Sequence, residues 1–80
     1  MKGFYTMKSK NIKINNLKDL NLFVQNANHV NGDVCIYRGK FCVDGKSLMG
    51  AVSLNTAAGC RVEYPDNAIE FENFISKFEF

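Results

Sequence analysis

The stretch VCIYRGKFCV, residues 34–43, decides the fold. It holds two short apolar runs on either side of Arg38 and Gly39, and a two-residue turn with glycine between such runs predicts a β-hairpin. The register expected from that turn pairs the following residues across the two strands: Ile36 with Phe41, Val34 with Val43, and Cys35 with Cys42. A hairpin in the middle of an 80-residue chain indicates an antiparallel sheet.

The chain before the hairpin predicts a strand and then a helix. Residues 4–8 are aromatic and β-branched enough for a strand. Apolar residues at steps of three and four then predict an amphipathic helix, which Asn15 or Asn16 caps and which ends near Asn28. Its expected apolar face consists of Leu17, Leu20, Phe23, Val24 and Ala27.

The chain after the hairpin predicts a helix, a strand and a last helix. Ser47 is the expected N-cap of a short helix over 47–54. Strict alternation of apolar and polar residues predicts a half-buried strand over 60–64, ended by Pro65. Either Asp66 or Asn67 is the expected cap of the last helix. The expected apolar stripe of that helix consists of Ala68, Ile69, Phe71, Phe74, Ile75 and Phe78.

These elements predict a single α+β domain over residues 1–80, in the order β-α-β-β-α-β-α. An antiparallel four-stranded sheet covered on one face by three helices is the simplest arrangement of this order. The other face is then open to water, and Arg61, Glu63 and Lys40 are expected to point outward from it.

The overall charge and hydropathy indicate a cytoplasmic protein. Ten Lys and Arg residues against eight Asp and Glu residues give a net charge of +2, too small a bias to indicate a nucleic-acid or membrane partner. No apolar run approaches the roughly 18 residues that span a bilayer, and the first ten residues, MKGFYTMKSK, lack the apolar segment of a signal peptide.

The cysteines and the histidine do not indicate a metal or cofactor site. Cys35, Cys42 and Cys60 are odd in number and have no CxxC spacing, and His29 is the only histidine. Cys35 and Cys42 are within reach of a disulfide if they oppose each other, but a cytosolic location favours two free thiols.

The segment GKSLMGAVSL, residues 45–54, is similar to the HPr family, the histidine-containing phosphocarriers of the bacterial phosphoenolpyruvate-dependent sugar phosphotransferase system. That family typically reads Lys-Ser-Ile-Met-Gly-Val-Met-Ser-Leu here. Residues 55–80 fit the continuation, including the small residues 57–59, and the Val24-Gln25 pair matches in the first helix. The resemblance implies an HPr-like open-faced β-sandwich with a role in sugar transport and no enzymatic activity.

The chain departs from the family at the carrier site, where the family has His-Ala-Arg-Pro at the start of the first helix. The family's spacing from Ser47 places Asn16 at the histidine, with Leu17, Lys18 and Asp19 after it. An asparagine amide has no basic nitrogen to form a phosphoramidate, and Asp19 adds negative charge beside the expected phosphate. We therefore expect that the carrier reaction is lost and that no residue is catalytic.

The resemblance also implies a regulatory site at Ser47. In the low-GC Gram-positive branch of the family, the matching serine is phosphorylated by a dedicated kinase to signal catabolite state. A cap and a phosphorylation site are compatible uses of one hydroxyl. The residues expected to bind protein partners are Lys18, Lys46, Leu48, Met49 and Val52, although the apolar ones among them equally fit a packed core.

Three functions follow as alternatives. The leading hypothesis is a regulatory HPr-like protein whose partners belong to the phosphotransferase or catabolite-control system and include a serine kinase. The second is an active phosphocarrier that uses a residue outside this alignment. The third is an unrelated small binding module, for which RNA is the obvious ligand, but the outward-facing strand residues carry no aromatic pair typical of RNA-binding sheets. The oligomeric state does not follow from the sequence.

Overall fold

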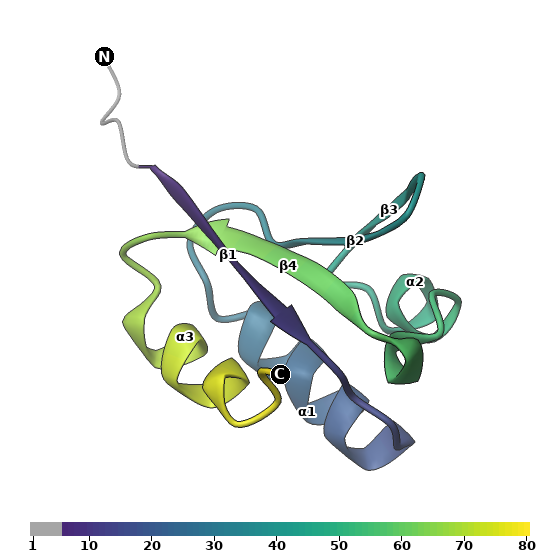
Figure 1. Ribbon diagram of the computed structural model, residues 1–80. Helices are drawn as coiled ribbons and strands as arrows, with labels where there is room; N and C mark the ends of the chain where they lie inside the picture. Colours follow the sequence, from purple (N-terminus) through teal and green to yellow (C-terminus); the bar gives the residue numbers. More distant parts are fainter. Residues whose placement is uncertain (1–5) are drawn as a thin grey trace.

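The computed structural model describes residues 6–80, which form four strands, three α-helices and one 3-10 turn (Figure 1). In chain order these elements are β1 (Met7–Ile12), α1 (Leu17–Ala27), β2 (Cys35–Arg38), β3 (Phe41–Asp44), α2 (Leu48–Val52), η1 (Thr56–Ala58), β4 (Cys60–Pro65) and α3 (Ile69–Ser76). The predicted order β-α-β-β-α-β-α is confirmed.

The four strands form one antiparallel sheet in the order β1-β4-β2-β3. The helices lie on one face of this sheet, with α1 and α3 side by side and α2 close to β3 (Figure 1). The predicted α+β fold with one open sheet face is therefore confirmed. In the described part of the chain, no helix is long and apolar enough to cross a bilayer.

The core is centred on an aromatic cluster that joins α1, β4 and α3. The Phe71 ring lies edge-on to Phe23 at 5.4 Å and to Tyr64 at 5.6 Å between ring centroids. All three side chains are buried, and Phe23 has an exposed fraction of 0%. Edge-to-face pairs of this kind add stabilisation beyond their buried area. The predicted apolar faces of α1 and α3 therefore meet here.

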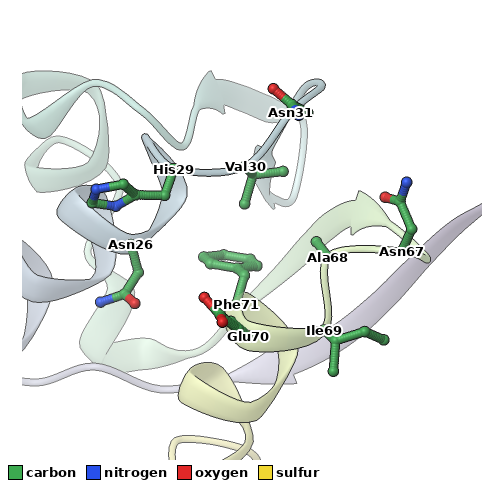
Figure 2. A pocket seen from close by; sticks show the side chains of 9 residues that line it. All are labelled: Asn26, His29, Val30, Asn31, Asn67, Ala68, Ile69, Glu70 and Phe71. Carbon is green, nitrogen blue, oxygen red and sulfur yellow. The ribbon is translucent and has the colours of Figure 1, made fainter.

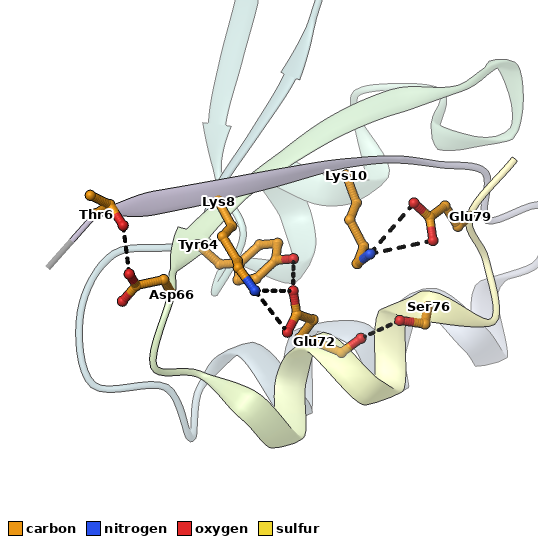
Figure 3. Close-up of polar contacts among 8 residues, drawn as sticks. All are labelled: Thr6, Lys8, Lys10, Tyr64, Asp66, Glu72, Ser76 and Glu79. Carbon is orange, nitrogen blue, oxygen red and sulfur yellow. Dashed lines mark hydrogen bonds and ion pairs between the residues drawn. The ribbon is translucent and has the colours of Figure 1, made fainter.

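The first strand was expected over 4–8, but the structure shows it as β1 (Met7–Ile12); residues 4 and 5 lie outside the described range. The strand continues through polar residues because each of its residues pairs with β4. Two lysines on its inner face also meet acidic partners near the C-terminal end. Lys8 Nζ lies 3.0 Å from a carboxylate oxygen of Glu72, and Lys10 Nζ lies 3.3 Å from Glu79 (Figure 3). Hydrogen bonds from Tyr64 and Lys8 lower the pKa of Glu72.

The hairpin turn lies one residue further along the chain than expected, so every cross-strand partner shifts by two residues. The turn residues are Gly39 and Lys40, since Arg38 pairs with Phe41, so Lys40 lies in the turn and not on the open sheet face. Gly39 has φ +61°, and a two-residue hairpin turn needs a residue that adopts such a left-handed conformation at its first position. The other observed pairs are Ile36 with Val43, Cys35 with Asp44, and Tyr37 with Cys42.

The new register places Cys35 and Cys42 diagonally on the sheet, so the predicted direct opposition of the two cysteines is wrong. Diagonal neighbours stand too far apart for a disulfide unless the backbone moves. Both thiols are free, as is that of Cys60. Burial raises the pKa of the Cys60 thiol to about 11.

Two apolar residues predicted to be buried are exposed instead. Leu17 and Ile69 are the first residues of α1 and α3, and their exposed fractions are 64% and 56%. Both side chains lie in the first turn, beyond the part of each helix that packs on the core. The N-cap of α3 is Ala68, not Asp66 or Asn67. Asp66 is used elsewhere, because its carboxylate accepts a hydrogen bond from the Thr6 hydroxyl (Figure 3).

The open sheet face carries a polar network on β2 and β4. Arg61 Nη1 lies 3.0 Å from Glu63 Oε2, and the Tyr37 hydroxyl donates to Glu63 Oε1 at 3.2 Å. The Arg61 guanidinium also lies 4.4 Å from the centre of the Tyr37 ring. The hydrogen bond to Glu63 raises the pKa of Tyr37 to about 12. Arg61 and Glu63 therefore point outward, as expected.

Candidate functional site

The N-terminus of α1 is closed by a reciprocal pair of hydrogen bonds. Asn16 is the N-cap, as expected, and its Oδ1 accepts from the Asp19 backbone N–H at 2.8 Å. Its Nδ2 donates to Asp19 Oδ2 at 2.9 Å. Both ends of the Asn16 amide are therefore engaged by one residue, in the manner of a capping box.

This cap changes the electrostatics of the helix end. An uncapped N-terminus attracts anions because its first N–H groups and the helix dipole are positive. Here the Asp19 carboxylate lies within the first turn and offsets that charge. The exposed Lys18 beside it is the one cation of the first turn. A phosphoryl group brought to Asn16 would meet a carboxylate and an amide with no basic nitrogen.

The N-terminus of α2 is capped by Ser47, as expected. Ser47 Oγ accepts from the Gly50 backbone N–H at 3.2 Å, and the residue is half-buried. Gly50 allows α2 to approach β3, because a Cβ at this position would lie 3.3 Å from the Cβ of Val43. Ser47 is therefore both a helix cap and a residue that lies partly at the surface.

The outer side of α2 carries exposed apolar side chains next to Ser47. Met49 has an exposed fraction of 84%, Val52 of 52% and Leu48 of 37%. Ala51 and Leu54 are the residues of this segment that pack inward. Of the two alternatives left open by the sequence, the structure favours a surface patch for Leu48, Met49 and Val52 over a packed core.

Ser47 and Asn16 lie at opposite ends of α1. The start of α2 is tied to the end of α1, because Asn28 Nδ2 donates to the Lys46 carbonyl at 3.1 Å and Lys46 Nζ donates to the Val30 carbonyl at 2.9 Å. An 11-residue helix is roughly 16 Å long. Lys18 and Lys46 therefore lie near opposite ends of α1.

The end of α2 returns to the start of α1. Thr56 in η1 donates from its hydroxyl to the Ile14 carbonyl at 2.8 Å, and the Ile14 N–H donates to the Thr56 carbonyl at 3.2 Å. Ile14 lies two residues before the cap. The segment formed by α2 and η1 thus runs alongside α1. Ser47 lies at one end of this segment, and the loop beside Asn16 lies at the other.

Two solved structures share the fold of this chain. Phosphocarrier protein HPr from Bacillus anthracis is 25% identical, with a TM-score of 0.65, over 91% of this chain and 98% of that one. This chain has the HPr fold. HPr-C-His from Thermoanaerobacter tengcongensis is 23% identical, with a TM-score of 0.71, over 89% of this chain and 91% of that one. No protein-family model and no curated protein matches the sequence.

The HPr fold of this chain also carries a groove that the sequence did not predict. It has a volume of about 550 Å³ and lies between the end of α1 and the start of α3 (Figure 2). His29, just after α1, and Glu70 in α3 line it, above the buried Phe71 ring. Its walls come from two segments about 40 residues apart in the sequence, so no local motif predicts the groove. Among residues 6–80, no group of three His, Cys, Asp or Glu side chains is placed to hold a metal ion.

Proposed function

We propose that this chain is an HPr-like protein of the bacterial phosphoenolpyruvate-dependent sugar phosphotransferase system that acts by regulated partner binding, not by carrying phosphate on a histidine. The observation that carries this proposal is the Asn16–Asp19 cap, which occupies the helix end where the resemblance places the phosphohistidine. The shared fold with a structure named as a phosphocarrier protein supports the connection to this system.

The remaining histidine is a poor substitute for the missing one. His29 follows the C-terminal end of α1, and its Nδ1 lies 3.0 Å from the Gln25 carbonyl. The C-terminus of a helix presents carbonyl groups and the negative end of the dipole, so it disfavours a phosphoryl group. An active carrier that uses the sole histidine of the chain is therefore the weaker proposal.

Ser47 is the residue through which we propose that the chain is regulated. The residue is half-buried and not enclosed in the core, and a kinase needs the serine hydroxyl to reach the γ-phosphate in line. The Gly50 N–H that now bonds Ser47 Oγ can equally bond a phosphate oxygen. Phosphorylation adds about −1.5 to −2 charge beside the exposed apolar side chains of α2. The main consequence is a change in which partner binds.

The partners proposed for this surface are proteins of the phosphotransferase or catabolite-control system, including the serine kinase. Leu48, Met49 and Val52 supply exposed apolar area, and a contiguous apolar patch on a small domain is typical of a protein interface. Lys18 and Lys46 supply positive charge at its two ends. In this proposal the chain is cytoplasmic and needs no cofactor, metal, membrane or nucleic acid.

Incubation with the family's serine kinase and ATP should add one phosphoryl group to this chain. Ser47→Ala should abolish the addition, because it removes the acceptor hydroxyl. Ser53→Ala is the matched control: Ser53 is the C-cap of α2, and its loss should leave labelling unchanged. Intact mass reads the result, and circular dichroism confirms that each variant folds. An unchanged mass of the wild-type chain, with a genuine HPr phosphorylated in the same tube, would leave Ser47 as a helix cap alone.

A further inference from the structure

A hollow of about 410 Å³ lies between the β2–β3 hairpin and the end of α2. It is separate from the α2 surface around Ser47, because it lies beside Ser53, Leu54 and Asn55 at the other end of that helix. Its volume is within the range of about 300 to 1,000 Å³ that is typical of small-molecule sites. The hollow therefore has room for a small ligand.

The charged group of this hollow is Arg38, which has no acidic partner. None of the three ion pairs among residues 6–80 includes it. Its Nε is buried and has no hydrogen-bond partner. Arg61, by contrast, is paired with Glu63 at 3.0 Å. The residue as a whole is only half-buried, so its guanidinium has hydrogen-bonding capacity that no acidic group of residues 6–80 uses and that an anion in the hollow can engage.

The surroundings of Arg38 favour an anion with an apolar body. No Asp or Glu side chain lines the hollow. Its walls are mainly apolar and include Phe41, with an exposed fraction of 69%, together with Val43 and Leu54. Asn55 completes the rim, and its side chain makes no cap hydrogen bond. A planar guanidinium is suited to a carboxylate, which accepts two parallel hydrogen bonds from it.

We propose that this hollow binds a small carboxylic acid with an apolar body, anchored by the Arg38 guanidinium. The carboxylate accepts from Arg38, and the apolar body packs between Phe41 and Leu54. This inference is independent of the proposed function, because it does not use Ser47, Asn16 or any phosphotransferase partner. It assigns a ligand site to the hairpin end of the domain.

Titration of the ¹⁵N-labelled protein with benzoate tests the proposal, because benzoate joins a carboxylate to an apolar ring. We expect a saturable shift of the Arg38 Nε–H resonance. Benzyl alcohol lacks the charge and inorganic phosphate lacks the apolar body, so both should bind at least about tenfold more weakly. Arg38→Gln should weaken benzoate binding by at least about tenfold. Lys40→Gln removes an exposed cation of the same hairpin and should leave the affinity unchanged.

Amide spectra of each variant establish that the fold is intact. Arg38→Lys is a second variant, which keeps the positive charge but loses the planar guanidinium. It should bind benzoate more weakly than the wild-type protein and more tightly than Arg38→Gln. An unmoved Arg38 Nε–H resonance with benzoate would overturn the proposal. So would equal benzoate affinity of Arg38→Gln and the wild-type protein, or phosphate binding as tight as benzoate binding.

Discussion

Replacing Asn16 with His, Lys18 with Arg and Asp19 with Pro should convert the start of α1 into an acceptor of a phosphoryl group. The imidazole supplies the basic nitrogen that Asn16 lacks, and Arg supplies a guanidinium for the phosphate oxygens. Loss of Asp19 removes the carboxylate that now bonds Asn16 at 2.9 Å. The positive helix end is then free to hold an anion. Incubation with phosphoenolpyruvate and the upstream enzyme of the system should yield acid-labile phosphate on the triple variant.

The single variant Asn16→His is the matched control for this gain. It introduces the acceptor but keeps Asp19 in the first turn, so we expect much less phosphate on it than on the triple variant. Circular dichroism shows whether both variants keep the fold. A folded triple variant that takes up no phosphate would mean that the surface that docks the upstream enzyme has diverged as well as the acceptor.

Phe23→Ala should have the largest effect on stability. Phe23 is fully buried in α1, and its ring lies 5.4 Å from that of Phe71 in α3. Truncation of a buried Phe typically lowers the free energy of unfolding by about 3–5 kcal/mol through lost burial and a cavity. The whole free energy of unfolding of a native protein is about 5–15 kcal/mol, so this variant should be close to unfolding at room temperature. Urea denaturation followed by circular dichroism measures the loss.

Leu17→Ala is the control for Phe23→Ala because it removes an apolar side chain from the same helix at an exposed position. We expect a change in the free energy of unfolding within about 0.5 kcal/mol. Equal losses for the two variants would contradict the placement of the core between α1, β4 and α3.

Features set by local chemistry could be predicted from the sequence. The sequence predicts caps at Asn15 or Asn16 and at Ser47, because a short polar side chain before an apolar run satisfies the free N–H groups of a helix, and the structure shows Asn16 and Ser47 in these places. The alternation of apolar and polar residues similarly predicts β4, and the apolar periodicity predicts α1. The family resemblance around Ser47 added the overall arrangement, and the solved HPr structures agree with it.

Features set by long-range contacts could not be predicted in this way. The polar strand β1 depends on pairing with β4, which lies far along the chain, and Lys8 and Lys10 meet Glu72 and Glu79, more than 60 residues away. The hairpin register depends on which residue takes the positive φ, and moving the turn by one residue shifts every cross-strand partner by two. The unpaired Arg38 depends on the absence of an acidic neighbour in space. None of these has a local signal in the sequence.

The central claim is that this chain has the HPr fold but does not carry phosphate at the start of α1. Its most direct test is the intact mass of the wild-type chain after incubation with phosphoenolpyruvate and the upstream enzyme, with a genuine HPr in a parallel reaction. We expect an unchanged mass for this chain and one added phosphoryl group on the genuine HPr. Acid-labile phosphate on the wild-type chain would contradict it.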